Sequence, residues 1–208
     1  MSLSRKETAK AVAKYAAKKI ADLQSEYAPD NGKGSSPQGR ARIARLRRDM
    51  DGDTSTWMLI GDELFTGWPQ ELAQPTYGSP ELNAVHTALG LYALHQQSQS
   101  RGVAQRFQQD LSKRMTFGRA CRCIEPDLAQ AKGVLRRLRV AEGSVDFKGI
   151  VRSVRALITL MRGKGIQLDY GSLAKDLYLV QFEDLRSSVF QSWGRDFYST
   201  KPQASDNQ

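Results

Sequence analysis

Hydrophobic residues recur every three or four positions along most of this chain, which is the spacing of one face of an α-helix. Residues 3–27 carry such a stripe, with lysines displayed elsewhere on the helix. The cleanest stripe runs from Phe147 to Met161, and Ser79-Pro80-Glu81 marks a strong helix start before another. No run of β-branched residues with period two stands out. The pattern therefore predicts an all-α fold, a helical bundle.

Further helices are expected at 38–48, at 99–122 with a break near Phe117-Gly118, around 134–141, from Asp169 to Leu177, and across 185–197. Ser36 before Pro37, Ser144 and Asp169 are the predicted caps at helix starts, because their side-chain oxygens can accept from free backbone N–H groups. Gly163-Lys164-Gly165 is expected to end the stripe of residues 147–161.

Turn-forming residues divide these helices into two parts. Residues 28–37 read as a linker, and 51–79 are rich in glycine and proline with only short hydrophobic clusters. We expect a smaller N-terminal helical part, residues 1–79, packed on a larger C-terminal helical bundle, residues 80–198. The polar tail, residues 199–208, is expected to be disordered.

Charge is distributed unevenly along the chain. The net charge is +9, yet residues 49–100 hold seven acidic residues and no lysine or arginine. Residues 1–48 hold twelve basic residues against four acidic ones, and residues 101–139 hold ten against three. Two separated basic blocks favour a grooved or two-sided surface for a polyanion, with the acidic stretch turned away from phosphates or docking a basic protein.

The densest basic cluster has five arginines between residues 40 and 48. Wound as a helix, Ile43, Leu46 and Met50 fall on one narrow stripe, so this segment should dock by three apolar residues with its arginines around the exposed perimeter. Arginine suits bidentate phosphate contacts, whereas a merely solubilising face usually mixes both charge signs. The cluster predicts contact with nucleic acid through Arg40, Arg42, Arg45, Arg47 and Arg48.

The second block repeats this arrangement. A stripe of Val134, Leu135, Leu138 and Ala141 should point Arg136 away from the core with Arg137 on a flank. Lys113, Arg114, Arg119 and Arg122 precede it. The lysines of residues 3–27 are interpreted as a solvated face, with weak phosphate steering as the alternative.

Sequence features of catalysis and of metal or cofactor binding are weak. Gly163-Lys164-Gly165 ends a helix, whereas a phosphate-binding loop opens one. Asp51 and Asp53 lack a histidine companion, and His86 and His95 are nine residues apart, outside the spacing of a shared metal. Cys121 and Cys123 are the only cysteines. We expect no catalytic residues, no cofactor and no metal.

No stretch approaches the roughly twenty apolar residues that cross a bilayer, and the first helix has a mostly alanine face that binds lipid poorly. We expect no membrane partner and a cytoplasmic protein, which also fits the absence of a disulfide framework.

Several motifs, taken in order, resemble the CasB-type small subunit of Cascade, the type I-E CRISPR surveillance complex. They extend over residues 38–198 and comprise Ala44-Arg45-Leu46-Arg47-Arg48, Leu89-Gly90-Leu91-Tyr92-Ala93-Leu94-His95-Gln96, Phe117-Gly118-Arg119-Ala120, Arg136-Arg137, Leu168-Asp169-Tyr170 with Leu173 and Asp176-Leu177, and Trp193-Gly194-Arg195-Asp196-Phe197-Tyr198.

The resemblance implies a non-catalytic, all-helical protein of antiviral defence, present as two copies beside the other Cascade subunits. It would help to hold guide RNA and target DNA, and would give the displaced single-stranded DNA a basic path that stabilises the R-loop. By position it implicates Arg47, Arg48, Arg119, Arg136 and Arg137. Charge and location alone nominate Arg40, Arg42, Arg45, Lys113, Arg114 and Arg122.

Two departures limit this transfer. Lys132-Gly133 leaves the start of the second arginine helix, and hence the facing of Arg136 and Arg137, open by a residue or two. Residues 83–86 offer no cation that could extend the basic track.

Two other classes of protein remain open. One is a free-standing helical RNA- or DNA-binding protein, although no helix-turn-helix signature supports it. The other is a structural adaptor whose arginines meet acidic protein surfaces. Copurification with a guide RNA and several proteins would separate the Cascade subunit from both.

Overall fold

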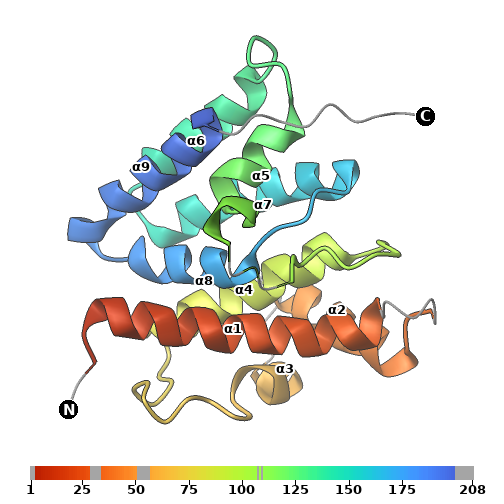
Figure 1. Ribbon diagram of the computed structural model, residues 1–208. Coiled ribbons are helices and arrows are strands. Elements are labelled where there is room, and N and C mark those ends of the chain that lie inside the picture. Colours follow the sequence, from red (N-terminus) through yellow and green to blue (C-terminus); the bar gives the residue numbers. More distant parts are fainter. Residues whose placement is uncertain (1–2, 29–33, 51–56, 107, 109, 200–208) are drawn as a thin grey trace.

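The computed structural model describes residues 3–28, 34–50, 57–106, 108 and 110–199, and within them the fold is all-α, as predicted (Figure 1). The elements are α1 (Arg5–Tyr27), α2 (Pro37–Met50), α3 (Trp57–Leu64), α4 (Pro80–Gln96), the 3₁₀ turn η1 (Leu111–Lys113), α5 (Phe117–Ile124), α6 (Lys132–Glu142), α7 (Phe147–Lys164), α8 (Tyr170–Leu179) and α9 (Glu183–Ser199). Among the helices of these residues, none combines the length and apolar composition needed to cross a membrane.

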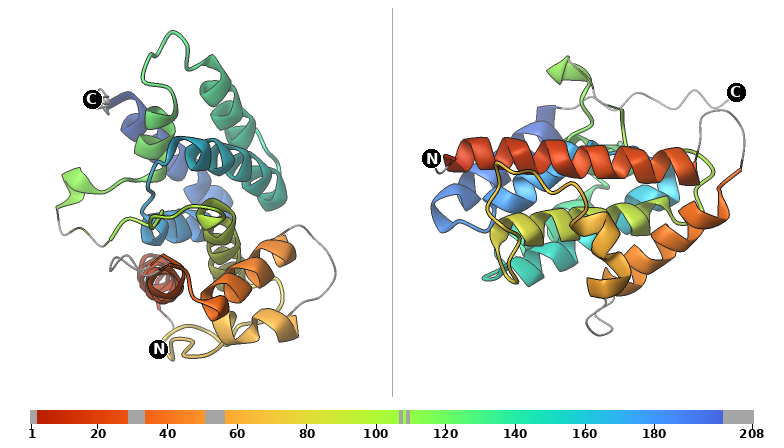
Figure 2. Two further views of the ribbon diagram at one scale, coloured as in Figure 1. Left: turned by 90° about the vertical axis from the view of Figure 1, so that its right-hand side faces the viewer. Right: turned by 90° about the horizontal axis from the view of Figure 1, so that it is seen from below.

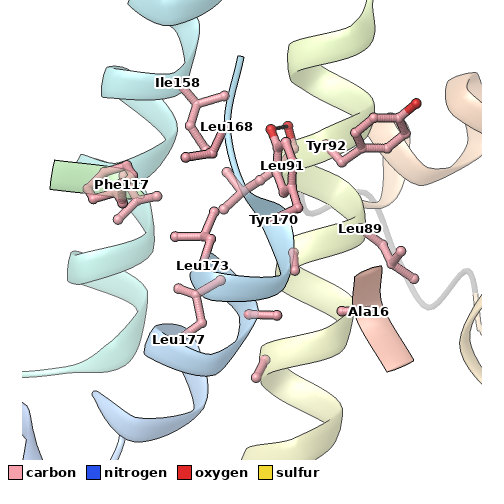
Figure 3. Close-up of a cluster of buried hydrophobic side chains, with 14 of the residues drawn as sticks. Ala16, Leu89, Leu91, Tyr92, Phe117, Ile158, Leu168, Tyr170, Leu173 and Leu177 are labelled. Atoms are coloured by element: carbon pink, nitrogen blue, oxygen red, sulfur yellow. Dashed lines mark hydrogen bonds between the residues drawn. The ribbon is translucent and has the colours of Figure 1, made fainter. Parts of the chain in front are cut away.

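Helix α4 lies at the centre of the molecule. Thirteen of its seventeen residues are buried, so it has no polar face to turn toward water. Helices α1, α2, α3, α7 and α8 pack around it. Leu91 and Tyr92 of α4 lie beside Tyr170 of α8 in Figure 3. The predicted start is confirmed: the Ser79 side chain accepts from the Leu82 backbone N–H, and Pro80 occupies the first turn.

Helix α1 lies along α8 and α4 through the predicted stripe, in which Val12, Ala16, Ile20 and Leu23 are buried. Ser4 and Glu7 form a capping box at its start, which satisfies two backbone N–H groups that would otherwise lack partners. An exposed ion pair between Arg5 and Asp184, 2.8 Å apart, connects α1 to α9.

Helices α5, α6, α7 and α9 form the upper part of the molecule in Figure 1, while α1, α2 and α3 form the lower part. Helices α6 and α2 also lie apart in both turned views of Figure 2. Helix α5 packs on α9, and α6 packs on α7. The stripe of α7 is confirmed, with Ile150, Val154, Leu157 and Met161 fully buried. The division of the chain at Pro80 stays a prediction.

Two of the predicted helix-terminal features are confirmed and one is wrong. Asp169 accepts from the Ser172 N–H at the start of α8, and Gly165 adopts a left-handed φ of 64° at the end of α7. Ser144, however, does not cap α7. Asp146 does so by accepting from the Gly149 N–H, while the Ser144 hydroxyl donates to the Val140 carbonyl.

Of the predicted basic helical region 99–122, the part from Phe117 onward is helical, as α5, but the earlier part is wrong, because the described residues from Gln99 to Thr116 are non-helical apart from η1. Long-range hydrogen bonds hold residues 103–105 extended instead. The Leu168 N–H donates to the Val103 carbonyl, and the Gln105 N–H donates to the Leu168 carbonyl, each at 2.9 Å. The Gln24 amide contacts both backbone groups of Ala104. The predictions for the side chain of Met50, for residues 51–56 and for the tail 200–208 concern parts of the chain outside the described residues.

The contact between α5 and α9 leaves no room for a side chain at Gly118. A Cβ built there would overlap the Trp193 carbonyl oxygen and lie 2.9 Å from Asp196 Cβ. We expect Gly118→Ala to lower the unfolding free energy by about 1–3 kcal/mol, since backbone atoms must shift. Gly163→Ala is the matched control. It meets nothing within 4 Å and should raise stability by about 0.5–1 kcal/mol. Urea denaturation measures both, and equal effects would contradict this account of the α5–α9 contact.

The Asp176 side chain of α8 is 13% exposed, and its carboxylate accepts a hydrogen bond from the Trp193 indole Nε1 at 2.8 Å. Burial raises the pKa of Asp176 to about 6, while Lys175 and the indole act in the opposite direction. Between pH 4 and 6 the folded protein therefore binds more proton at this group than the unfolded chain does. Its contribution to stability is fullest at the acidic end and is lost as pH rises toward 6.

Asp176→Asn should remove this loss of stability with rising pH, and the side-chain oxygen of asparagine can still accept from the Trp193 indole. The unfolding free energy of the variant relative to wild type should rise by about 2–3 kcal/mol between pH 4 and 6. Denaturant titrations across this range measure the difference directly, so other titrating groups cancel. A difference that stays constant with pH would show that Asp176 ionises alike in both states.

Candidate nucleic-acid interface

Helix α2, which carries the arginine cluster, docks as the apolar stripe predicts. Ile43 and Leu46 are buried, and the helix contacts α4, α1 and α3. The Ser36 hydroxyl accepts from the Gly39 N–H at 2.9 Å. A Cβ on Gly39 would lie 2.8 Å from the Glu26 carbonyl oxygen, so this glycine lets α2 approach the end of α1 closely. That approach brings the arginines of α2 beside carboxylates of α1 and α3.

Arg42 points into the protein and makes two ion pairs there. Its Nε lies 2.9 Å from Glu63 of α3, and its Nη1 lies 2.9 Å from Glu26 of α1. The Glu63 side chain is only 2% exposed, against 21% for Arg42. Burial alone would lower the pKa of Arg42, but hydrogen bonds to both glutamates outweigh it and raise that pKa. Arg42 therefore joins three helices.

Arg45 is the second cation near Glu63, with its Nη2 3.6 Å from the same carboxylate oxygen. The prediction that the arginines of this helix surround its exposed perimeter is thus wrong for Arg42 and only partly right for Arg45. The sequence does not reveal these ion pairs, because Glu26 and Glu63 lie 16 and 21 residues from Arg42.

The other arginines of α2 face outward. Arg40 and Arg48 are exposed and Arg47 is half-buried. Arg40 donates to the Ser35 carbonyl at 2.6 Å, which keeps it beside the start of the helix. Arg47 and Arg48 lie in the last turn of α2, where positive charge also complements the helix dipole.

The four cations of residues 113–122 have different roles. Lys113 is exposed, and the Nε of half-buried Arg114 donates to the Gln108 carbonyl. Arg119 Nη1 contacts three carbonyl oxygens, those of Leu111, Ser112 and Arg114, and so fixes the loop around η1.

Arg122 does not reach the surface. It is 6% exposed, donates to the Glu125 carbonyl at 2.6 Å, and lies over the Phe197 ring. A strand on the surface could not reach its guanidinium, so we drop Arg122 from the proposed contact set.

Helix α6 presents its arginines to solvent. Val134 and Ala141 are buried against the core, whereas Arg136 and Arg137 are exposed. Arg137 Nη1 donates to the Gly133 carbonyl one turn earlier. These positions resolve the facing that Lys132-Gly133 had left open. Since α2 and α6 lie in different parts of the molecule (Figures 1 and 2), their exposed arginines form two separate basic surfaces.

A third group of cations lies along α1, and of its members only Arg114 belonged to the predicted interface. Lys10, Lys14 and Lys18 of α1 line a groove with Arg106, Arg114 and Lys175. The four-residue spacing of the lysines was visible in the sequence, but no local signal places Arg106 or Lys175 opposite them. The pairing of residues 103–105 with Leu168 does so in the structure.

Of the histidines and cysteines, His95 and Cys121 are buried, and His86 and Cys123 are half-buried. His95 Nδ1 lies 3.0 Å from the Tyr170 hydroxyl, and burial lowers the pKa of His95 to about 4, which keeps it neutral at pH 7. Burial raises the thiol pKa of both Cys121 and Cys123, which disfavours reactive thiolates. Over the part of the chain that the structure describes, no group of three or more potential ligands could hold a metal ion.

The sequence model of the family described as CRISPR-associated protein Cse2 matches residues 42–198. Among solved structures, CasB from Thermobifida fusca is similar with a TM-score of 0.70 and 29% identity, covering 91% of this chain and 98% of that one. CasB from M. ruber is similar in fold, with a TM-score of 0.57 and 20% identity over 86% of this chain and 92% of that one. A comparison with curated proteins finds no match.

The ion pairs of α2 predict which arginines stabilise the fold. Arg42→Ala would leave the buried Glu63 with only the longer contact to Arg45, so we expect a loss of about 3 kcal/mol in unfolding free energy. Arg48→Ala, on the same helix but exposed, should change stability by less than about 0.5 kcal/mol. Urea denaturation of both variants gives the comparison. Similar losses would mean that the Glu63 network adds nothing specific to stability.

Proposed function

The chain belongs to the family of CRISPR-associated protein Cse2, the CasB-type small subunit of the type I-E Cascade complex, and from this we propose that it is a non-catalytic nucleic-acid-binding subunit. Its partners are guide RNA, target DNA, the displaced single-stranded DNA, other Cascade subunits and a second copy of itself. Its role is to stabilise the R-loop in antiviral defence, in the cytoplasm.

One observation carries this proposal: exposed arginines lie on two different helices that are docked by their apolar faces. Arg48 on α2, and Arg136 and Arg137 on α6, are exposed, and Arg47 is half-buried beside Arg48. Neither pair is needed to fill the core. Guanidinium groups in such positions suit bidentate contact with phosphate oxygens.

Contacts of this kind position a strand without reading its sequence. In an RNA-guided complex, base pairing between guide and target supplies the specificity, and the protein has only to hold backbones. The proposed contact set therefore comprises Arg47, Arg48, Arg136 and Arg137, with Arg40, Lys113, Arg114 and Arg119 as further cations near the surface.

An adaptor function is the second candidate, and the Arg42 network is the observation that favours it. Arg42 and Arg45 already bind carboxylates, so arginines of α2 can meet acidic protein groups as readily as phosphates. The exposed arginines would then contact other subunits. Strand binding and subunit assembly separate the two functions.

Removing exposed arginines in pairs should weaken strand binding and leave the fold intact. For Arg47→Ala/Arg48→Ala, and for Arg136→Ala/Arg137→Ala, we expect the affinity for single strands to fall by a similar factor whatever their sequence. The slope of log affinity against log salt should fall by roughly one per charge removed, because fewer counterions are released. Fluorescence anisotropy with labelled single strands at several salt concentrations measures both quantities, and the complex carrying each variant should hold a shorter-lived R-loop.

Lys6→Ala/Lys164→Ala is the matched control, since it removes two exposed charges from other places. Its salt slope should equal that of wild type. If the paired arginine variants instead fail to join the other subunits while intact complexes form R-loops normally, the adaptor function is correct. A strong base preference, or affinity unaffected by salt, would also contradict the proposal.

A further inference from the structure

A groove with a volume of about 710 Å³ lies beside α1. Helix α1 forms one wall, and residues 104–106 with Arg114 and the start of α8 form the other. Its rim carries six cations: Lys10, Lys14, Lys18, Arg106, Arg114 and Lys175. The only carboxylate in the lining is that of Asp169, which is already bound to the backbone N–H and hydroxyl of Ser172.

Small side chains line the inside of the groove. Ala13, Ala17 and Ala21 follow one another at four-residue intervals along α1, and Gly171 faces them from α8. A Cβ on Gly171 would lie 3.2 Å from Ala17 Cβ, so the two helices approach closely there. Ala17 and Ala21 nevertheless remain exposed. A row of methyl groups without bulky neighbours lets the backbone of another helix come near.

Lys10, Lys14 and Lys18 run parallel to the alanine row at the same interval. Four residues of α-helix rise about 6 Å, so the ammonium groups form a ladder with that repeat. A partner helix with acidic residues at i and i+4 presents carboxylates with the same repeat. The groove therefore matches an acidic helix in both spacing and charge.

A nucleic-acid strand fits the same groove less well. Binding of single strands combines basic grooves with aromatic rings on which bases stack. Tyr170 is the only aromatic residue in the lining, but it is 2% exposed and its hydroxyl donates to the Leu91 carbonyl. Most of the rim cations are lysines, which lack the planar fork of arginine that suits phosphate. The exposed arginines of α2 and α6 have that fork.

We propose that this groove receives an acidic amphipathic helix from another protein of the complex. Small apolar residues of that helix would lie on the alanine row, and its carboxylates would meet the lysines of α1. Lys175, which also lies 3.7 Å from Asp176 Oδ1, would add a cation across the groove. This is recognition of a helix in a groove, with charge complementarity setting its register. The inference rests on membership of the complex and does not require the strand-binding function.

Zero-length coupling of amines to carboxylates in the purified complex, followed by mass spectrometry, tests the occupant directly. We expect Lys10, Lys14, Lys18 or Lys175 to be joined to aspartates or glutamates of a helical segment in a different subunit. Links to another copy of this chain would identify a self-contact and overturn the proposal. Ultraviolet cross-links to nucleic acid from the α1 wall of the groove, at Lys10, Lys14 or Lys18, would overturn it as well.

Charge reversal tests the same point by assembly. Lys14→Glu/Lys18→Glu should reduce retention of the subunit in the purified complex at least tenfold, while the free variant keeps its melting temperature and binds oligo-dT within twofold of wild type. Lys6→Glu/Lys164→Glu is the control. Lys6 continues the lysine row one turn beyond the groove lining, so this variant should assemble normally.

Ala21→Leu adds a neutral variant that fills the groove without changing charge, and it should lower retention severalfold. Normal assembly of Lys14→Glu/Lys18→Glu would overturn the proposal. Normal assembly with weakened oligo-dT binding would assign the groove to a strand instead. Either result leaves the test of Arg47, Arg48, Arg136 and Arg137 untouched, so the two proposals fail separately.

Discussion

The burial of α4 on all sides is the constraint on which the rest of the structure depends. Leu89, Leu91 and Tyr92 are successive or nearly successive in the chain, yet all three are fully buried. A helix can bury residues at such positions only if other helices cover it from several directions. Helices α1, α2, α3, α7 and α8 do so, and each contributes its own apolar stripe. The polar end of α4 also fixes its surroundings, because Gln96 bonds to the backbone of Gln99, Arg101 and Val103 and thereby holds the next segment extended.

This central helix determines where charge can lie. Helix α4 carries no lysine or arginine, so the excess positive charge of the chain falls on the helices and loops around it. Where α2 and α3 meet beside α4, Glu63 is buried and needs a cation, because an unpaired buried carboxylate is costly. Arg42 meets that need. The cations beyond this junction, among them Arg48 and Arg136, have no such structural task and can serve an anionic partner.

Local sequence signals predicted much of the fold, whereas contacts between distant residues decided the rest. Ser79 and Asp169 cap helices as expected because a cap depends on residues within one turn. The extended path of residues 103–105 depends on Leu168 and Gln24, which no periodicity near Gln99 could reveal. The candidate site divides in the same way. The facing of Arg136 follows from the stripe of its own helix. The inward course of Arg42 follows from Glu63 and Glu26, and that of Arg122 from the Phe197 ring, all distant in the sequence.

The kinds of cation also differ between the surfaces, and this bears on how one small subunit could contact both strands and proteins. The proposed strand-contact residues on α2 and α6 are arginines, whose donors keep a fixed planar geometry. The ladder on α1 is made of lysines, whose flexible stems can follow carboxylates on a helix that settles against Ala17 and Ala21. A phosphate contact requires only an accessible guanidinium and no particular surface shape, whereas docking of a helix requires a hollow lined by small residues. The groove beside α1 offers such a hollow, and Ala17 and Ala21 are exposed in it. Chemistry and shape together are therefore the grounds for proposing that the arginines of α2 and α6 contact strands and that the groove beside α1 receives a protein helix.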